Sequence, residues 1–418
     1  MQELNAAIVT IGDELLIGQV VDTNSAWIAQ QLNQHGIWLK QRISVGDNKE
    51  EIFQGLKTAE RDAKIIIITG GLGPTADDIT KPVLCEYFGG KMIVDEAVLA
   101  HIKYLFTEVF KRPLIERNLK QAEVPDVCTV LHNERGTAPG MWFEKDGRVY
   151  VSLPGVPHEM KGLMEKLVLP KLSQLFETPF IEHRTLLTAG VGESFLAETI
   201  KDWEEKLPKH LKLAYLPNYG MVRLRITGWG THKETLNQQL DEQFEALKSL
   251  VKQWLVTDRD ETLQMTLSRM LREKHKTMST AESCTGGYIA HLITAIDGAS
   301  SNYKGTVVSY DNEVKTQVLK VSPETLRSVG AVSEEVVREM VEGAIMLMNT
   351  DYAVAVSGIM GPDGGTPEKP VGTVWIAAGS RQNIVAQKFQ FKYDRMRNIE
   401  MTAMTALNLL RKFIIENG

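Results

Sequence analysis

A serine and nearby histidines in the last third of the chain raise the question of nucleophilic catalysis. Ser283 lies in the stretch AESCTGG, which ends a predicted strand over residues 277–281 and opens a predicted helix over 286–296. A serine at a strand-to-helix turn is exposed, and backbone amides beside it can stabilise an oxyanion. Serine needs a base, but His275 falls before the strand and His291 falls inside the helix. The pattern therefore predicts a serine nucleophile whose base is not a histidine.

Lys315 is the candidate base, because a lysine with a lowered pKa can serve a serine in this role. It follows a predicted strand over residues 306–310 and lies one crossover unit after Ser283, so both side chains can reach the same edge of a sheet. Three other interpretations stay open. Ser283 only caps the helix, Lys315 lies on a solvated face, or Cys284 is the nucleophile because a helix N-terminus lowers the pKa of a thiol.

A glycine-rich loop and two arginines later in the same segment are further candidates for ligand binding. The loop of residues 357–372 has five glycines in sixteen positions and is too long for a hairpin turn, so we interpret it as a functional loop. Arg395 and Arg397 open the last predicted helix, where a phosphate could be bound.

A second set of chemically capable residues lies near the N-terminus, in two loops that follow predicted strands. Residues 10–15 contain Gly12, Asp13 and Glu14, and residues 70–78 read GGLGPTADD. Both loops fall at the carboxyl ends of strands, where open α/β sheets bind ligands. Glycine amides can approach a phosphate, and carboxylates suit a divalent metal. We predict phosphate contacts at Gly12, Gly71, Gly73 and Thr75, and metal contacts at Asp13, Glu14, Asp77 and Asp78.

The alternative is that these loops are only tight turns and helix caps. Thr75 in particular can cap the helix that follows it. Two further loops, residues 136–140 and 153–160, could close a site over the first two. The glycine spacing matches neither the dinucleotide-binding fingerprint nor the P-loop, so it does not favour NAD or a P-loop nucleotide.

The order of predicted elements supplies the framework that positions these residues. Strand and helix signals alternate over residues 1–170, which is typical of an open α/β sheet. Residues 171–257 give strand, helix, two strands and helix, and residues 258–418 return to alternating strands and helices. We therefore predict an α/β protein with two open α/β sheet domains joined by a small α+β module.

The net charge and the composition limit the classes of partner that we expect. The 418 residues include 47 Lys and Arg against 53 Asp and Glu, a net charge of −6, so there is no chain-wide basic footprint for nucleic acid or an anionic membrane. The α+β module lacks a pair of glycines three apart, which an RNA-binding KH loop needs, so we interpret it as a spacer or dimerisation module. Three scattered cysteines, no basic signal peptide and no apolar run of ~18 residues lead us to expect a cytoplasmic protein.

Motifs at both ends of the chain resemble the CinA (competence/damage-inducible protein A) family. The N-terminal motifs are GDELL, VVDTNS, GGLGPTADD, GTAPG and LPGVPHEM, and the C-terminal ones are AESCTGG, SYDNEVK and SGIMGPDGGTPEKPVGTV. The resemblance implies a MoaB/MogA-like N-terminal domain, a KH-like middle domain and a C-terminal nicotinamide mononucleotide (NMN) deamidase domain. It implies hydrolysis of NMN to nicotinate mononucleotide and ammonia without a cofactor. It also implies an ADP-ribose pyrophosphatase that depends on a divalent metal (Mg, Mn or Co).

Carried over by position, the resemblance gives roles to single residues. Ser283 is the nucleophile and Lys315 the base, while Ser300 is a polar helper and Arg397 contacts the substrate phosphate. Further substrate contacts fall on Thr285, Gly286, Gly287 and Tyr310. The departures from the family pattern, Met360 and Asp363, lie in the glycine loop and bear on substrate fit.

The partners that the resemblance implies are small-molecule nucleotides, namely NMN and ADP-ribose. Nucleic acid and membranes are not expected as partners, and a homodimer is the expected assembly. The alternative function is a molybdopterin- or nucleotide-binding regulatory protein whose N-terminal domain is inactive.

Overall fold

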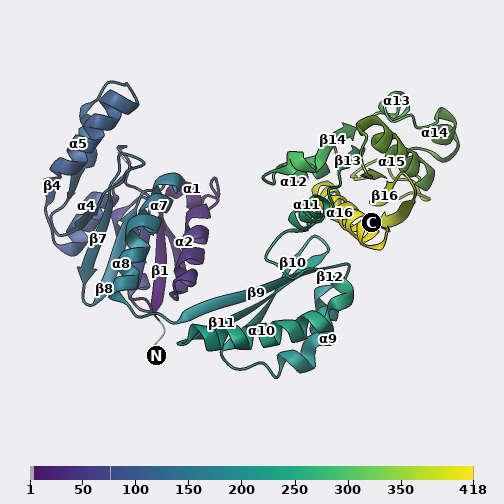
Figure 1. Ribbon diagram of the computed structural model, residues 1–418. Helices are drawn as coiled ribbons and strands as arrows, with labels where there is room; N and C mark the ends of the chain where they lie inside the picture. The colour runs from purple at the N-terminus through teal and green to yellow at the C-terminus, as the bar shows by residue number, and fades with distance from the viewer. Residues whose placement is uncertain (1–3, 76, 418) are drawn as a thin grey trace. The chain divides into compact units, whose positions relative to one another are not determined.

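The computed structural model describes residues 4–75 and 77–417. The chain divides into two compact units (Figure 1). The first comprises the residues up to Glu182 together with Trp229–Leu236, and the second comprises His183–Gly228 and the residues from Asn237 onward. The predicted α/β class with several open sheets is confirmed. The boundary between the two units runs through the α+β module, whose residues are divided between them.

The first unit is built on a six-stranded sheet in the order β2-β1-β3-β8-β7-β6. The first four strands are parallel, and the last two are antiparallel to their neighbours. The strands are β1 (Asn5–Ile11), β2 (Trp38–Val45), β3 (Ile65–Thr69), β8 (Arg148–Leu153), β7 (Gly140–Lys145) and β6 (Thr129–Leu131). All five residues of β3, IIIIT, are buried, as expected for a central parallel strand covered on both faces.

Helices cover both faces of this sheet. On one face lie α2 (Thr23–Gln34), α7 (Pro157–Leu163) and α8 (Leu169–Leu175), and on the other lie α3 (Lys49–Ala59) and α4 (Thr80–Phe88). Alternate residues of β3 enter the two cores, with Ile65 and Ile67 on one side and Ile66 and Ile68 on the other. The remaining elements are α1 (Asp13–Leu16), β4 (Met92–Val94), α5 (Glu96–Tyr104), α6 (Glu116–Leu119) and β5 (Glu123–Pro125).

The α+β module has the predicted order of strand, helix, two strands and helix. Its elements are β9 (Phe180–Ala189), α9 (Glu193–Glu204), β10 (Leu211–Asn218), β11 (Met221–Gly230), α10 (Lys233–Leu250) and a short added strand, β12 (Leu255–Thr257). The sheet order is β10-β11-β9-β12.

The C-terminal sheet has the order β14-β13-β15-β16-β17, with β14, β13 and β15 parallel and the last two antiparallel. Its strands are β13 (Met278–Glu282), β14 (Tyr303–Val308), β15 (Tyr352–Gly358), β16 (Thr373–Ser380) and β17 (Ile384–Gln390). Its helices are α11 (Leu263–Glu273), α12 (Tyr288–Thr294), α13 (Asn312–Gln317), α14 (Pro323–Val329), α15 (Glu334–Met348) and α16 (Arg395–Asn417). Helices α11, α12 and α16 share one core, and α15 packs on the opposite face.

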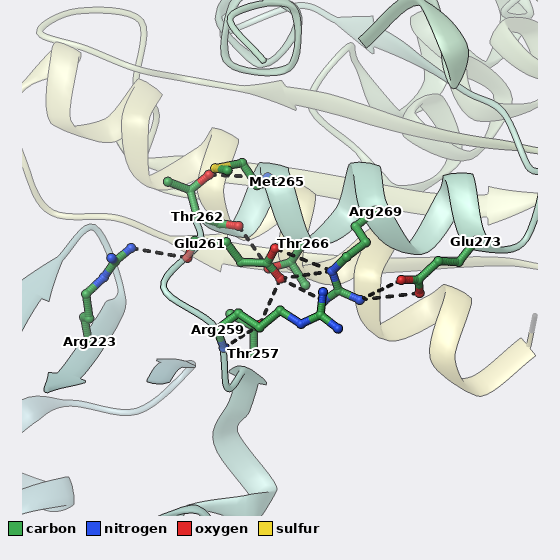
Figure 2. Close-up of polar contacts among 9 residues, drawn as sticks. All are labelled: Arg223, Thr257, Arg259, Glu261, Thr262, Met265, Thr266, Arg269 and Glu273. Atoms are coloured by element: carbon green, nitrogen blue, oxygen red, sulfur yellow. Dashed lines mark hydrogen bonds and ion pairs between the residues drawn. The ribbon is translucent and has the colours of Figure 1, made fainter. Parts of the chain in front are cut away.

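Polar contacts fix the passage from the α+β module into the C-terminal sheet domain (Figure 2). The carboxylate of Glu261 accepts hydrogen bonds from Arg269 Nη2 at 2.8 Å, Thr257 Oγ1 at 2.9 Å and Thr266 Oγ1 at 3.2 Å. Burial alone would raise the pKa of Glu261, but the hydrogen bonds, Arg269 foremost, outweigh burial and lower it. Glu261 therefore ties the start of α11 to the end of β12. Within the described residues, no helix combines the length and apolar character needed to cross a bilayer.

Candidate active sites

Ser283 lies directly after β13, between the ends of the two neighbouring parallel strands, and its side chain is buried rather than exposed as the turn position predicted. Its amide donates to the carbonyl of Val356 on β15 at 3.1 Å, and the amide of Ser309 after β14 donates to the carbonyl of Glu282 at 2.8 Å. All three strand ends therefore meet at the carboxyl edge of the sheet, as the sequence predicted. This is the edge at which open α/β sheets bind ligands.

The Ser283 turn (residues 283–287) is held by Glu282, a residue to which the sequence reasoning gave no role. Its carboxylate is fully buried and accepts from Thr285 Oγ1 at 2.7 Å and from the amides of Gly287 at 3.1 Å, Ile289 at 3.0 Å and Ala290 at 2.8 Å. A buried carboxylate is tolerated when such hydrogen bonds replace its hydration. The signal that could have found it is an acidic residue at the end of a strand, a few positions before a helix start.

This arrangement corrects the expected oxyanion hole. The Gly287 amide is committed to Glu282, and the Gly286 amide donates to the carbonyl of Ser283 at 3.2 Å. Helix α12 begins at Tyr288 because Gly286 and Gly287 have positive φ angles of 61° and 98°. Among the described residues, the amide of Thr285 has no backbone acceptor, so it is the donor of the turn that stays available, whereas the Cys284 amide is engaged with its own thiol.

Lys315 is buried on the short helix α13, with an exposed fraction of 1%. Its Nζ donates to the carbonyl of Ser309 at 2.6 Å and to the carbonyl of Tyr310 at 3.3 Å. Burial lowers the pKa of Lys315, and the nearby Asp311 and Cys284 act in the opposite direction. Lys315 therefore does not lie on a solvated face, and its burial favours the neutral amine that a general base requires.

The structure disfavours Cys284 as a nucleophile. The thiol is buried, and burial raises its pKa to about 12 although Lys315 and Arg395 act to lower it. A reactive cysteine needs a lowered pKa, because the thiolate is the nucleophile. The Lys315 amine lies near the turn that carries Ser283, because it donates to the carbonyl of Ser309, whose own amide donates to the carbonyl of Glu282.

Arg395 connects the glycine loop (residues 357–372) to Tyr310, which lies shortly after β14. Its Nη1 donates to the carbonyl of Gly361 at 2.7 Å, and its Nη2 donates to the hydroxyl of Tyr310 at 3.3 Å. Both Arg395 and Tyr310 are exposed, so this pair presents a cation and a phenol at the rim of the Ser283 site.

The N-terminal loops meet in a cavity of about 390 Å³ at the carboxyl ends of β1, β2 and β3. Six of the predicted residues line it: Gly12, Glu14, Gly71, Gly73, Asp77 and Asp78. Gly71 is required at its position, because its φ is +64° and an added Cβ would lie 2.2 Å from Thr80 Oγ1. The sequence thus predicted the place of this cavity and most of its lining.

Several of the predicted phosphate contacts are engaged within the protein itself. The amide of Gly12 donates to Val45 O at 3.1 Å, and the amides of Gly73 and Thr75 each donate to the carboxylate of Asp78 at 2.8 Å. Among the described residues, the amide of Gly71 has no acceptor and stays available for a ligand. These bonds correct the phosphate roles of Gly12, Gly73 and Thr75.

Thr75 and Asp78 hold their own loop together. The Thr75 hydroxyl donates to Asp78, and a hydrogen bond from Thr75 also lowers the pKa of Asp77. Thr75 does not cap the next helix, which begins only at Thr80 and has no side-chain cap at Ile79. Asp78 is therefore a loop-stabilising carboxylate rather than a free metal ligand.

Asp47, which the sequence reasoning missed, also lines this cavity. Its Oδ2 accepts from the Asp13 amide at 3.0 Å, and Asp13 Oδ1 accepts from the Asp47 amide at 3.2 Å. Burial raises the pKa of Asp47, and the charges of Asp13, Glu14 and Asp77 raise it further. Its position directly after β2 was the available signal, because the other acidic loops also follow strands.

The carboxylates of this cavity fit a divalent metal that is held partly by substrate phosphates and water. Among the described residues, no three His, Cys, Asp or Glu side chains converge as a ready-made metal site. Mg²⁺, however, is commonly held by one or two carboxylates together with substrate phosphates and water. Glu14, Asp47 and Asp77 around one cavity supply that donor chemistry.

Comparison with known proteins assigns the family. Sequence models match residues 7–174 (probable molybdopterin binding domain), 183–256 (damage-inducible protein CinA KH domain) and 260–414 (CinA C-terminal domain). A CinA-like protein from Cytophaga hutchinsonii is 47% identical over 98% of both chains. The chain belongs to the CinA family. A CinA-like protein from Flavobacterium psychrophilum is 46% identical over 99% of both chains.

One solved structure similar to this CinA chain is competence damage-inducible protein A from Klebsiella pneumoniae. It is 35% identical, and the match covers 37% of this chain and 97% of that one, with a TM-score of 0.37.

Two roles carried over from the CinA resemblance do not fit this fold. Ser300 lies in the short turn before β14, at the amino edge of the sheet, whereas Ser283 lies at the carboxyl edge. The six residues of β14, at roughly 3.3 Å each, separate the two edges, so Ser300 cannot assist Ser283 within one chain. A motif alignment gives sequence position but not the end of the strand to which a residue belongs.

Arg397 is also placed away from the Ser283 site of this CinA chain. Its guanidinium lies over the ring of Tyr393 at 4.6 Å and lines a different cavity, together with Glu400 and Tyr219. Arg395, two positions earlier on the same helix, takes the place beside Tyr310. Two positions along a helix turn a side chain by about 200°, so Arg395 and Arg397 lie on different faces of α16.

Proposed function

We propose that the C-terminal domain hydrolyses the carboxamide of NMN to nicotinate mononucleotide and ammonia, with Ser283 as nucleophile and Lys315 as base. The observation that carries the proposal is the buried amine of Lys315, with its lowered pKa, beside the turn that holds Ser283. The CinA C-terminal domain match supports it.

The contacts of Lys315 suit a neutral amine. A neutral amine has two N–H donors and one lone pair, whereas the ammonium has three donors. The carbonyls of Ser309 and Tyr310 accept the two N–H groups of the neutral amine. The lone pair then points away from both carbonyls and can accept a proton. We assign that lone pair to the hydroxyl proton of Ser283.

The reaction then proceeds in two steps. Lys315 takes the proton as the Ser283 oxygen bonds to the amide carbon, and the available amide of Thr285 stabilises the oxyanion. The C–N bond breaks, and Lys315 returns the proton so that ammonia leaves and an acyl-serine remains. Water, deprotonated by Lys315, then attacks the acyl carbon, and the proton returns to Ser283 as nicotinate mononucleotide is released. No metal or organic cofactor takes part in this scheme.

We assign the substrate phosphate to Arg395 and Tyr310. The guanidinium is exposed, is always charged and offers several donors of the geometry that phosphate accepts. Its hydrogen bond to Gly361 O orients it from the glycine loop, so that this loop, which contains Met360 and Asp363, contributes to substrate fit.

For the N-terminal domain we propose metal-dependent cleavage of the pyrophosphate of ADP-ribose. Glu14, Asp47 and Asp77 would hold the divalent cation, Mg, Mn or Co, which supplies charge neutralisation at the phosphates and an activated water. The Gly71 amide would donate to a phosphate oxygen, and Asp13 would position Asp47 through their paired hydrogen bonds.

A second candidate function for this domain is ligand binding without catalysis. Two observations favour it: the matching family model is described as a probable molybdopterin binding domain, and no three metal-ligating side chains converge among the described residues. The chain would then be an NMN amidase with a pterin- or nucleotide-binding regulatory domain.

Two assays separate these proposals. Purified protein incubated with NMN is expected to yield equimolar ammonia and nicotinate mononucleotide in the presence of EDTA, and absence of both products would refute the amidase. Incubation with ADP-ribose and Mg, Mn or Co is expected to release AMP. If AMP is not released although a nucleotide binds, the regulatory interpretation replaces the pyrophosphatase.

A further inference from the structure

A cavity separate from the Ser283 turn lies within the second unit, where the β10–β11 hairpin meets the helices of the C-terminal domain. Its volume is about 480 Å³, in the range of small-molecule sites. The lining includes the apolar side chains of Leu263 on α11 and Met404 on α16. The rings of Tyr219 at the hairpin tip and Tyr288 on α12 also line it. An apolar cavity lined by two aromatic rings suits a flat aromatic ligand.

The hairpin tip is held in an unfavourable conformation at this cavity. Tyr219 and Gly220 form the two-residue turn, with φ angles of 42° and 77°. Both central residues of this turn type need a positive φ, which favours Asn or Gly and disfavours an aromatic residue. A strained aromatic residue beside a cavity is a reason to consider a functional role for its side chain.

The polar groups of the cavity leave hydrogen-bond acceptors for a ligand. Gln264 Oε1 is buried without a partner, which is costly unless a donor satisfies it. The Glu400 carboxylate lines the same cavity as Tyr219 and Tyr288 and is a second acceptor there. The cation of the lining, Arg223, is already bound to Asp260 and, as Figure 2 shows, to the carbonyl of Glu261. A ligand here needs N–H donors more than a phosphate.

We propose that this cavity binds the adenine ring of an adenine nucleoside, with the ring against Tyr219 and Tyr288 and its amino edge paired with the Gln264 carboxamide. A glutamine amide presents an acceptor and a donor that match the amino group and adjacent ring nitrogen of adenine. The site is distinct from the Ser283 turn, and its occupant would tie the hairpin to α11 and α12. This inference does not depend on either proposed hydrolysis.

The test is photolabelling of the full chain with 8-azidoadenosine, followed by mass spectrometry of the peptides. The wild type is expected to be labelled within residues 216–223 or 288–292. Gln264→Leu is expected to reduce that labelling at least about fivefold, the loss expected for one amide–adenine pair. The matched control Gln54→Leu, at an exposed helical glutamine in the other unit, is expected to label as the wild type does.

A second variant guards against misfolding. Tyr219→Asn suits the turn and removes the ring, so it is expected to lose the label while its melting temperature stays at or above that of the wild type. Labelling confined to other peptides, or labelling that persists in both Gln264→Leu and Tyr219→Asn, would overturn the proposal.

Discussion

The Nζ of Lys315 donates to the main-chain carbonyl of Ser309 over 2.6 Å, at the same sheet edge where Ser309 is bonded to the strand that carries Ser283. The contact fixes the amine from the strand next to the nucleophile. Because a main-chain carbonyl carries no full charge, it orients the amine without strongly favouring the protonated form. Burial, which lowers the pKa of Lys315, therefore dominates.

Replacing Lys315 should abolish turnover without unfolding the protein. Lys315→Met keeps the length of the side chain and removes a buried amine, so we expect kcat for NMN to fall by roughly 10²–10⁴-fold, the contribution typical of a general base. The melting temperature should not drop, because a buried ionisable group is replaced by an apolar one. A variant that keeps its rate would show that another group is the base.

The pH dependence should report the same amine. Protonated Lys315 cannot accept a proton, so kcat/KM should rise with pH and level off as the lysine becomes neutral. Because burial lowers its pKa, the midpoint should lie below the ordinary lysine value of 10.5. A rate that falls as pH rises from 6 to 9, measured by ammonia release, would contradict a neutral-amine mechanism.

Glu282 should be the residue whose loss destabilises the C-terminal domain most. Glu282→Ala leaves the buried Ile289 amide, the part-buried amides of Gly287 and Ala290 and the Thr285 hydroxyl without their acceptor, at a cost of about 1–3 kcal/mol for each buried group. We expect the free energy of unfolding in urea to fall by at least about 3 kcal/mol. The exposed Glu324→Ala, on α14, is the control and should change it by less than about 0.5 kcal/mol.

Gly71 offers a matched pair of glycine variants. Gly71 and Gly89 both have positive φ, but an added Cβ at Gly71 meets Thr80 Oγ1 at 2.2 Å, whereas at Gly89 it meets nothing within 4 Å. Gly89→Ala should therefore lower the free energy of unfolding by only about 1–2 kcal/mol, the cost of placing alanine at a positive φ. Gly71→Ala should cost more and weaken ligand binding in the N-terminal cavity. Equal losses of stability in thermal melts of the two variants would argue against a tightly packed loop at Gly71.

The Glu261 contacts should make the α11 junction sensitive to acid. The folded-state pKa of Glu261 is lowered, so its stabilisation is present above its unfolded pKa and is lost as pH falls through the lowered folded value. Arg269→Leu should remove about 1–3 kcal/mol at neutral pH and less at pH 3, because protonated Glu261 no longer needs the cation. Urea titrations at both pH values measure this. The exposed Glu273→Gln serves as control, and an equal loss for Arg269→Leu at both pH values would contradict this role for Glu261.

The sequence located the loops of both sites but not the contacts inside them. Ser283 and Gly71 could be placed because each follows a strongly apolar strand, and parallel strands bring their carboxyl ends to one edge. Glu282 was missed because its role depends on the path of the next helix. Ser300 and Arg397 were misplaced because sequence position shows neither which end of a strand a turn adjoins nor which face of a helix a side chain occupies.

The same limit applies to the N-terminal carboxylates. The sequence does not distinguish the acidic residues Asp13, Glu14, Asp77 and Asp78 from one another. In the structure, the Asp78 carboxylate already accepts hydrogen bonds from amides of its own loop. Hydrogen bonds within a loop depend on its backbone path, which residue types alone do not give. Asp47, which follows a strand as the others do, was within reach of the same reasoning.

The most direct test of the account is the rate of ammonia release from NMN by three proteins: wild type, Ser283→Ala and Cys284→Ala. A serine nucleophile with a neutral lysine base predicts a loss of at least about 10³-fold for Ser283→Ala. It also predicts near wild-type turnover for Cys284→Ala, because the buried thiol stays protonated. Full activity of Ser283→Ala together with an inactive Cys284→Ala would contradict it.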